Sequence, residues 1–330
     1  MNKIICFGEA LIDFLAQPGA TSQSPRAFLQ FAGGAPANVA VAAARLGAES
    51  HFVGMFGIDM FSDFLLDSLR QAGVGTEYVV RTDVANTALA FVALDEEGER
   101  SFNFYRPPAA DLLFRDVDFQ PDCFRGAAVF HVCSNSLTES AIAESTLSGM
   151  HRAHEAGALV SVDLNLRLAL WPALADPRPR VWQMLLAADI VKLARNELEY
   201  LATPLADEQA VLTKLFEGRA QLVIVTNGAE AIHWYTRAAH GTVKAFRVRA
   251  IDTTAAGDAF VGGFLSALVA RGIEGRRSAD VIADVAALEE ALRFGAATGA
   301  LAVTRNGAFE AMPTRAEVEQ LLGEQYEHAA

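Results

Sequence analysis

Asp258 follows three residues with almost no side chain and precedes an apolar run, AFVGGFLSALVA. We expect a helix to begin near Asp258. Backbone N–H groups at the start of a helix have no intrahelical partner, and the small side chains of Ala255, Ala256 and Gly257 let an anion approach them. The segment therefore predicts an anion hole, beside which Asp258 could accept a proton from an attacking hydroxyl group.

A simpler interpretation makes Asp258 the N-cap of a buried helix. A cap that also interacts with the helix dipole contributes ~1 kcal/mol. In that case Gly262 and Gly263 serve only close helix packing. The segment alone leaves both interpretations open.

A second motif near the N-terminus, FAGGAPANVAVAAARLG at positions 31–47, has residue types that suit a polar ligand. Gly33 and Gly34 allow close backbone approach, and Asn38 lies in the first turn of the expected helix. Asp13, in GEALIDF, could accept hydrogen bonds from a sugar diol. Together, the two motifs place a hydroxyl-bearing ligand near an anion hole.

Taken together, these segments resemble the signatures of the PfkB, or ribokinase-like, family of carbohydrate kinases, and most of all those of fructokinases. GGAPANVAVAAARLG with Gly54 and Gly57 is similar to the N-terminal signature, and DTTAAGDAFVGGFL to the C-terminal one. Family-like features extend from CFGEALIDF to TRNGAFEAMP. The resemblance implies a three-layer α/β/α sandwich with a mainly parallel central sheet and a small β-sheet lid. It also implies transfer of the γ-phosphoryl group of ATP to a sugar hydroxyl.

The resemblance assigns the catalytic roles near the C-terminal signature. It makes Asp258 the base, and the backbone amides of Ala255, Ala256 and Gly257 the donors that stabilise the transferring phosphoryl group. Asp252 would bind a monovalent cation such as K⁺.

The resemblance also implies a nucleotide and metal site. Asn196 and Glu199, in RNELEY, match the NxxE motif that organises the water shell of Mg²⁺, and Asn196 would lie near ATP. Thr226 and Gly228, in VTNGAEA, would lie near the phosphates and ribose of ATP, together with Gly257. Ala231 stands where glycine is usual, so the adenine pocket is left unassigned.

The substrate is expected to be an unphosphorylated sugar, because the glycine motif contains no lysine for a sugar phosphate. YRPPAADLLF resembles fructokinases more than sugar-acid kinases, and this resemblance implies fructose, phosphorylated at a primary hydroxyl to give fructose 6-phosphate. Arg106 and Arg167 could reach the ligand, as could Asn165 beyond a strand end, and arginine suits a carboxylate. A 2-keto-3-deoxygluconate kinase is therefore an alternative, as is a sugar-binding sensor without turnover. For each arginine, a surface position or an ion pair of the lid is a further alternative.

Short apolar runs alternate with helical stretches along most of the chain, which predicts a mainly parallel sheet covered by helices. We expect core strands in KIICFG, HFVGMFG, AAVFHVC, ALVSVDL, DIVKL and QLVIVTNG. Ligands of such folds bind beyond the carboxyl ends of the strands, and Asp163, Asn165 and Asn227 fall at such ends.

Two stretches, 11–31 and 86–106, interrupt this alternation, and the second has the period-2 pattern of a β-hairpin. We expect them to form the lid, with 1–10, 32–85 and 107–330 forming the α/β domain. A hairpin added to the edge of the main sheet is the alternative. Apolar residues on the lid favour a homodimer formed through it.

The composition limits the other classes of function. With 40 acidic against 27 basic residues, the net charge of −13 makes nucleic acid an unlikely partner. No stretch reaches the ~20 apolar residues of a membrane span, and three dispersed cysteines predict buried free thiols and a cytoplasmic protein. None of the four lysines lies in a P-loop motif, and neither N-terminal glycine segment supplies GxGxxG. The partners predicted are therefore a small sugar and ATP, with no nucleic acid and no membrane.

Overall fold

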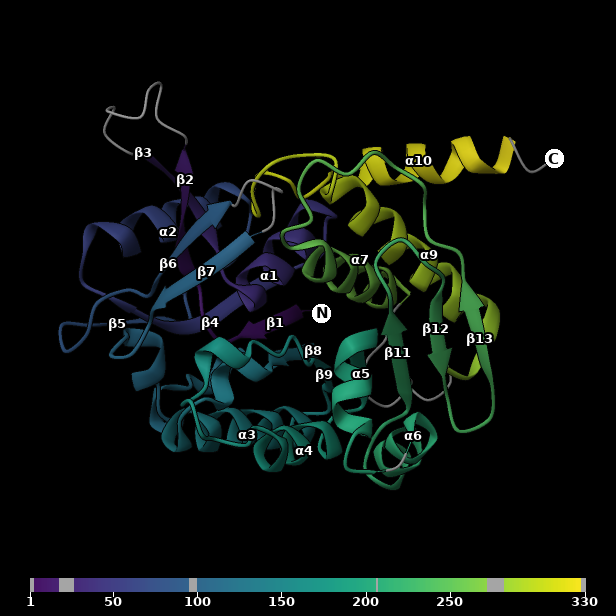
Figure 1. Cartoon of the computed structure of the whole chain (residues 1–330), viewed down its shortest axis with the longest axis horizontal. Coiled ribbons are helices and arrows are strands. Elements are labelled where there is room, and N and C mark those ends of the chain that lie inside the picture. The colour runs from purple at the N-terminus through teal and green to yellow at the C-terminus, as the bar shows by residue number, and fades with distance from the viewer. Residues whose placement is uncertain (1–2, 18–26, 95–99, 206, 272–281, 328–330) are drawn as a thin grey trace.

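The computed structural model describes residues 3–17, 27–94, 100–205, 207–271 and 282–327. These residues form a three-layer sandwich in which helices cover both faces of a large central sheet (Figure 1). A second, smaller sheet projects from one end of this sandwich. The fold class predicted from the sequence is confirmed.

The central sheet contains nine strands in the described part of the chain, in the order β13-β12-β11-β10-β9-β8-β1-β4-β5. The pairs from β5 to β11 are parallel, whereas β12 and β13 add an antiparallel edge. Strands β1, β8 and β9 are buried along their whole length, because a parallel sheet is covered on both faces. The strands are β1 (Lys3–Phe7), β4 (Ser50–Gly57), β5 (Val79–Thr82), β8 (Ala127–Cys133), β9 (Leu159–Asp163), β10 (Ile190–Ala194), β11 (Leu222–Thr226), β12 (Ile232–Tyr235) and β13 (His240–Val243).

The helices form two layers, each with its own hydrophobic core against the sheet. Helices α1, α7 and α9 pack on one face, and α3, α4, α5 and α6 lie on the other (Figure 1). The α-helices are α1 (Ala35–Arg45), α2 (Met60–Gln71), α3 (Ser140–Glu155), α4 (Arg178–Leu186), α5 (Arg195–Ala202), α6 (Glu208–Glu217), α7 (Ala256–Ala270), α9 (Val285–Ala302) and α10 (Arg315–Glu327).

Helix α7 is packed unusually close to its two neighbours. A Cβ atom on Gly262 would lie 2.9 Å from the carbonyl oxygen of Val39 in α1, and one on Gly263 would lie 3.1 Å from Cα of Gly295 in α9. Larger residues at either position would push the helices apart. These two glycines therefore fix the position of the N-terminus of α7 over the sheet.

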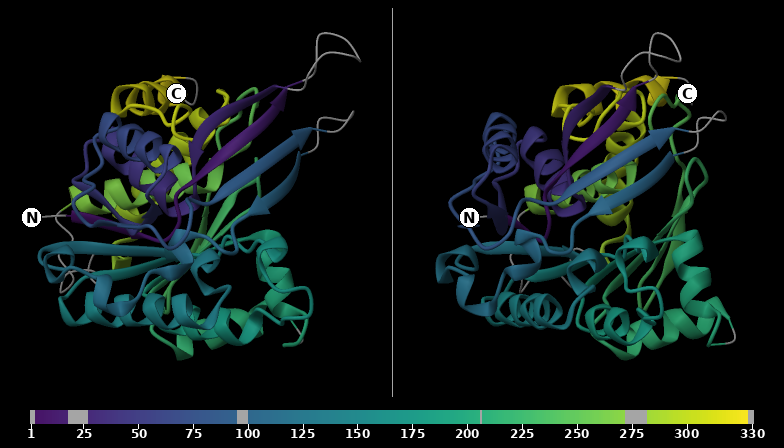
Figure 2. Two further views of the ribbon diagram at one scale, coloured as in Figure 1. Left: turned by 90° about the vertical axis from the view of Figure 1, so that its left-hand side faces the viewer. Right: turned by 60° about the vertical axis from the view of Figure 1, so that its left-hand side comes forward.

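The second sheet has the order β3-β2-β6-β7 and stands away from the sandwich (Figure 2). Its strands come from two separate parts of the chain and are joined by the parallel pair β2 and β6. The alternative of a hairpin added to the main sheet is wrong. The strands are β2 (Leu11–Gln17), β3 (Ala27–Gly33), β6 (Leu89–Leu94) and β7 (Arg100–Tyr105).

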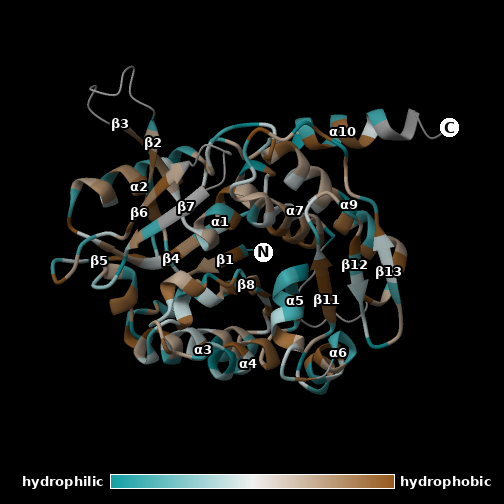
Figure 3. Cartoon of the chain, in the orientation of Figure 1, coloured by the Kyte–Doolittle hydropathy of each residue, from teal (hydrophilic) through white to brown (hydrophobic). Residues whose placement is uncertain are grey.

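Hydropathy follows the layers of the fold (Figure 3). Central strands such as β11 are hydrophobic, whereas α5 is mostly hydrophilic (Figure 3). Within the described residues, no helix combines the length and the apolar character needed to cross a bilayer. Cys6, Cys123 and Cys133 are buried and free, as the sequence predicted.

Candidate active site

The N-terminus of α7 lies at the carboxyl ends of the central strands. The helix begins at Ala256 and its N-cap is Ala255, in the left-handed conformation at φ 57° and ψ 13°. This conformation costs an alanine ~1 kcal/mol or more, and glycine would adopt it without that cost. No side chain caps the helix, and the amide of Ala256 makes only a long bond of 3.4 Å to the carbonyl oxygen of Thr253. Gly257, also in the first turn, is partly exposed.

Asp258 lies in the first turn of α7 and is not its N-cap, so the capping interpretation is wrong. Its side chain is buried, at 8% exposure, and Oδ2 accepts a hydrogen bond of 2.8 Å from Nδ2 of Asn38. Asn38 is itself buried, and its Oδ1 has no hydrogen-bond partner within the described structure. An unpaired buried acceptor is costly, and a ligand hydroxyl could satisfy it.

Burial and charge adjust the acidity of Asp258. Desolvation, followed by the nearby carboxylate of Asp163, raises its pKa from 3.8 to about 7. The hydrogen bond from Asn38 and the positive charges of Lys192 and Arg167 lower the pKa, but by less. A carboxylate with a pKa near 7 is suited to general-base catalysis at neutral pH.

Lys192 and Asp163 form a buried ion pair beneath α7. Nζ of Lys192 lies 3.1 Å and 3.0 Å from the two carboxylate oxygens of Asp163. The two residues are opposite one another in the β9–β10 ladder. The sequence analysis placed Asp163 at a ligand-binding strand end without giving it a role, and it did not place Lys192 at the site. The signal was a lysine within an apolar strand, DIVKL, beside another strand that ends in aspartate.

Helix α5 carries the residues predicted for the metal site, together with an acidic residue that was not predicted. Asn196 and Glu199 are exposed, whereas Glu197 is buried at 6% exposure. The Oε1 atom of Glu197 accepts from the amide of Leu166 and Oε2 from the amide of Ala194, both at 2.7 Å. Glu197 thus joins the start of α5 to the loop after β9.

Burial is the largest effect on Glu197 and raises its pKa, and the charge of Asp163 raises it further. Lys192 and the two amides oppose this shift. The carboxylate of this segment that interacts electrostatically with the buried ion pair is therefore Glu197.

Asp13 and the glycine motif lie where the second sheet meets the sandwich. Strands β2 and β3 pair antiparallel, and Oδ2 of Asp13 lies against Cα of Gly33. Gly34 is the N-cap of α1 with φ 106°, and a Cβ atom there would lie 2.6 Å from the carbonyl oxygen of Glu9. Asp13 also lines a small pocket with Asp252 and other residues. The full lining is Asp13, Leu15, Phe31, Val92, Asp252, Thr254, Gly307 and Ala308.

Arg106 forms an ion pair at the base of the second sheet. Its Nε and Nη2 donate to Oδ2 of Asp111 at 2.8 and 2.5 Å, and Nη1 donates to the carbonyl oxygen of Asn135 at 2.7 Å. At 1% exposure its guanidinium has little access to a ligand. The structure favours the lid ion pair over the predicted sugar contact, because these protein groups already occupy the arginine.

Arg167 and Asn165 follow β9 near Asp258. Arg167 is exposed, and its charge lowers the pKa of Asp258. Asn165 is half-buried with φ 42°. Arg167 therefore remains accessible and acts electrostatically on the candidate base.

The residues predicted to contact ATP and K⁺ lie on neighbouring loops. Thr226 ends β11, and Gly228 forms the following turn at φ 53°. Asp252 is buried and accepts from the amide of Thr254 at 2.8 Å and from that of Gly307 at 3.1 Å. Asp252 therefore ties the loop before α7 to the loop after α9.

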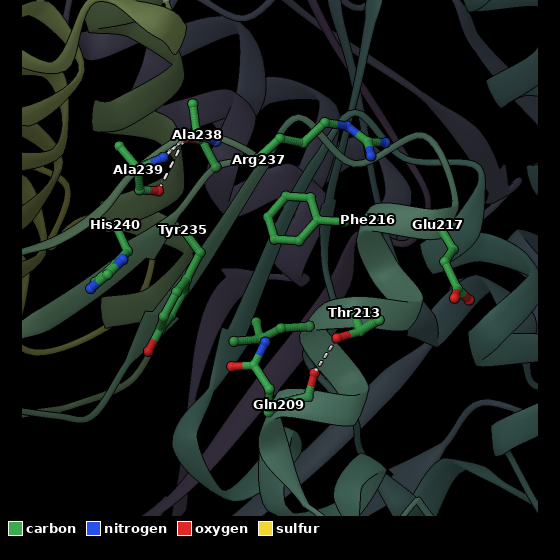
Figure 4. Close-up of a pocket in the computed structure, with 11 residues that line it drawn as sticks. Gln209, Thr213, Phe216, Glu217, Tyr235, Arg237, Ala238, Ala239 and His240 are labelled. Carbon is green, nitrogen blue, oxygen red and sulfur yellow. Dashed lines mark hydrogen bonds between the residues drawn. The ribbon is translucent and has the colours of Figure 1, made fainter.

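A separate groove lies between α6 and the β12–β13 hairpin, where Phe216 and Tyr235 project into it (Figure 4). Tyr235 pairs with Val223 near the start of β11, whereas Thr226 is at the other end of that strand. This groove therefore lies away from the base and the anion hole. Its lining is Gln209, Leu212, Thr213, Phe216, Glu217, Tyr235, Thr236, Arg237, Ala238, Ala239 and His240.

A buried base beside a helix start that is open to an anion, at the strand ends of an α/β/α sandwich, defines an enzyme of the phosphoryl-transfer class. The chain belongs to the pfkB family of carbohydrate kinases, whose sequence profile matches residues 1–315. Fructokinase-1 of Zea mays is 42% identical over 320 residues, which cover 97% of each chain.

Solved structures of fructokinases have the same fold. A fructokinase of Xylella fastidiosa with bound ATP is 57% identical, with a TM-score of 0.95 over 98% of this chain and 99% of that one. A double mutant of the Vibrio cholerae O395 fructokinase contains fructose, ADP and a potassium ion. It is 32% identical, with a TM-score of 0.82 over 98% of each chain.

Proposed function

We propose that this chain is an ATP-dependent fructokinase, which transfers the γ-phosphoryl group of ATP to the 6-hydroxyl of D-fructose and gives fructose 6-phosphate and ADP. The observation that carries this proposal is the buried Asp258, oriented by Asn38 at the uncapped start of α7. The fructokinases of Zea mays and Xylella fastidiosa, which match nearly the whole chain, support fructose as the substrate.

The proposed reaction begins with ionised Asp258. The carboxylate accepts the proton of the sugar hydroxyl as that oxygen forms its bond to the γ-phosphorus, and the bond from phosphorus to the leaving oxygen of ADP breaks. The amides of Ala255, Ala256 and Gly257 donate to the phosphoryl oxygens. Oδ1 of Asn38 accepts from another sugar hydroxyl, which satisfies an acceptor that is otherwise unpaired.

We propose that Asp13 and the backbone at Gly33 and Gly34 hold further hydroxyl groups of the sugar, beneath the second sheet. Asp13 lies on the sheet that we propose to act as the lid, so sugar binding would draw the lid towards α7. We propose that the described parts of 11–31 and 86–106 move as this unit against the described parts of 1–10, 32–85 and 107–330; positions 18–26 and 95–99 of the predicted lid lie outside the described residues. Closure would exclude water, which competes with the sugar as the acceptor.

The charges of the site fit a divalent cation. Asp163, Glu197 and Asp258 face one buried lysine, Lys192, so the phosphates of ATP would add to an excess of negative charge. We propose that Glu197 orients the water shell of Mg²⁺, in place of the exposed Glu199. When bound, Mg²⁺ would neutralise the phosphates and favour attack at phosphorus.

We propose that Thr226 and Gly228 contact the phosphates and ribose of ATP, since they lie at the carboxyl end of β11. We also propose that a potassium ion binds near Asp252, supported by the potassium in the Vibrio cholerae relative. Because Asp252 joins the two loops around the start of α7, such an ion would stiffen the anion hole.

The second sheet is also our proposed dimer contact. Phe28 and Tyr105 are 43% and 67% exposed, and both rings contact Phe91 within the sheet. Covering such aromatic surface with a second copy would stabilise both lids. We place the enzyme in the cytoplasm, where ATP is available.

Release of ADP from ATP, measured with fructose, glucose, ribose, 2-keto-3-deoxygluconate and fructose 6-phosphate, tests the substrate. We expect fructose to have the highest kcat/KM. A preference for the sugar acid that Arg167→Ala abolishes would identify a 2-keto-3-deoxygluconate kinase. Fructose binding without ADP release would identify a sensor.

The variant Asp258→Asn tests the base. It should lower kcat ~100-fold or more, while ADP affinity changes little, because the base acts only in the chemical step. Near-normal turnover in a folded Asp258→Asn enzyme would contradict the assignment.

A further inference from the structure

Lys192 and Asp163 lie in the middle of the central sheet, on the face covered by α7. Both side chains are less than a tenth exposed, and the ammonium group is bonded to both oxygens of the carboxylate. Burying such a pair has a high desolvation cost, and apolar residues of similar size often stabilise a fold equally well. Stability alone therefore does not explain why a charged pair occupies this buried position.

The pair has a definite orientation relative to α7. The position that a Cβ atom of Gly257 would occupy lies 3.1 Å from Nζ of Lys192 and 3.8 Å from Oδ2 of Asp163. The positive end of the pair is thus the nearer one to the first turn of α7. Both members of the pair also act electrostatically on Asp258, whose pKa Asp163 raises and Lys192 lowers.

We propose that Lys192, held in place by Asp163, is an electrostatic component of the anion hole and stabilises the phosphoryl group during transfer. This inference rests on the proposed kinase function. The backbone amides of α7 supply donors, and Lys192 supplies a full positive charge beneath them. Gly257 lacks a side chain at the point where one would separate the charge from the bound anion.

The energetic argument is that negative charge is redistributed over the phosphoryl oxygens as the bond to ADP breaks and the bond to the sugar forms. A fixed charge in a site shielded from water interacts strongly with this charge and needs no reorganisation. Lys192 gives up no proton. Burial, the largest effect, lowers its pKa, but Asp163, Glu197 and Asp258 together raise it above its usual value. It therefore stays charged throughout the reaction.

The experiment compares Lys192→Gln, Asp163→Asn and the double variant with the wild-type enzyme. Each single variant leaves one buried charge unpaired and should lower the thermal midpoint. The double variant removes both charges of the pair and leaves only Glu197 and Asp258 without the nearby cation, so it should recover part of that loss. We expect its kcat to remain ~100-fold or more below wild type, because one transition-state donor is missing, with fructose KM changed less than ~3-fold.

Lys3 offers a matched control, because it lies in the same sheet but at the amino end of β1, away from the carboxyl ends of the strands. It is equally buried, and its Nζ donates to the carbonyl oxygen of Asp122 at 2.9 Å. Lys3→Gln should lower the thermal midpoint and leave kcat of the folded enzyme within ~3-fold of wild type. This separates loss of a buried lysine from loss of the charge under α7.

The outcomes are distinguishable. If the wild-type enzyme does not release ADP with fructose, the proposed function fails. If it is active and the folded double variant keeps kcat within ~10-fold of wild type, the role of Lys192 is overturned. If the double variant does not fold, a comparison of Lys192→Arg with Lys192→Gln tests the role of Lys192. Because it retains the charge, kcat at least ~10-fold above that of Lys192→Gln supports the role, and equal loss overturns it.

Discussion

The side-chain amide of Asn38 donates to Oδ2 of Asp258 at 2.8 Å, and this bond joins two residues 220 positions apart in the chain. It connects the first turn of α1 to the first turn of α7. Both groups are buried, so the bond fixes the direction of the carboxylate in a low-dielectric environment. The N-terminal glycine motif thus orients the carboxylate that we propose as the base.

Asn38→Ala should therefore change the pH dependence of the reaction. The hydrogen bond lowers the pKa of Asp258, so its removal should raise that pKa and move the acidic limb of kcat/KM to higher pH. We also expect kcat to fall ~10- to 100-fold on the plateau above the acidic limb, where the base is ionised in both enzymes. Pre-steady-state phosphoryl transfer across pH measures both effects. Asn103→Ala, on the exposed surface of β7, is the control and should change neither.

The wild-type enzyme should itself show the raised pKa of Asp258. The reaction needs the ionised carboxylate, so kcat/KM should rise with pH through about 7 and level off above it. An aspartate of ordinary acidity would instead give a flat profile between pH 5 and 8. A flat profile would show that burial and Asp163 do not control the base as described.

The sequence was sufficient for features that depend on local patterns. Alternating apolar runs predicted the main sheet, and the period-2 hairpin predicted the second sheet. The small residues before Asp258 predicted a helix start, which the structure places at Ala256. Each of these patterns can be read from residues that are neighbours in the sequence, although the sheets themselves join separate segments.

Contacts between distant segments were not predictable in the same way. The bond between Asn38 and Asp258 depends on how closely α1 and α7 pack, which Gly262 permits. The pair of Lys192 and Asp163 depends on the register of β9 and β10. Neither a packing distance nor a register between strands can be read from one sequence without homologues.

The assignment of Asn196 and Glu199 depended on helix phase. Helix α5 turns by about 100° per residue, so these two residues share a face from which Glu197 points away. The spacing identified a shared face correctly but could not show that this face is exposed. Only the packing of α5 on β10 decides which carboxylate is buried.

Asp258 should make the fold less stable as pH rises. Its pKa is about 7 in the folded protein against an ordinary 3.8, so folding favours the protonated form. The stability that this gives is complete below pH 4 and is lost as pH rises through 7. Asp258→Asn should therefore raise the free energy of unfolding by ~2–4 kcal/mol at pH 8, and by progressively less towards pH 4. Urea unfolding at pH 5 and pH 8 measures this, and an equal gain at both values would contradict it.

The ion pair of Arg106 and Asp111 should matter for stability. Arg106→Met leaves the buried carboxylates of Asp111 and Glu9 without their cation, which should cost ~3–5 kcal/mol. The exposed Arg167 makes a matched control, and Arg167→Ala should change stability by less than ~0.5 kcal/mol. Urea unfolding measures both variants. If the Arg106→Met enzyme is stable but has a greatly increased KM for fructose, Arg106 would instead be assigned to the sugar site.

Glu197→Gln and Glu199→Gln together test where the metal-organising carboxylate lies. Glu197 is buried and interacts with Lys192, whereas Glu199 is exposed on the same helix. If Glu197 orients the water shell of Mg²⁺, its removal should increase the Mg²⁺ concentration for half-maximal activity ~10-fold or more. Glu199→Gln should change it less than ~2-fold, since an exposed charge is screened by solvent. Titration of activity with Mg²⁺ at saturating ATP and fructose measures the difference, and thermal midpoints show whether each variant is folded. A large effect of Glu199→Gln with none from Glu197→Gln would place the metal on the outer face of α5.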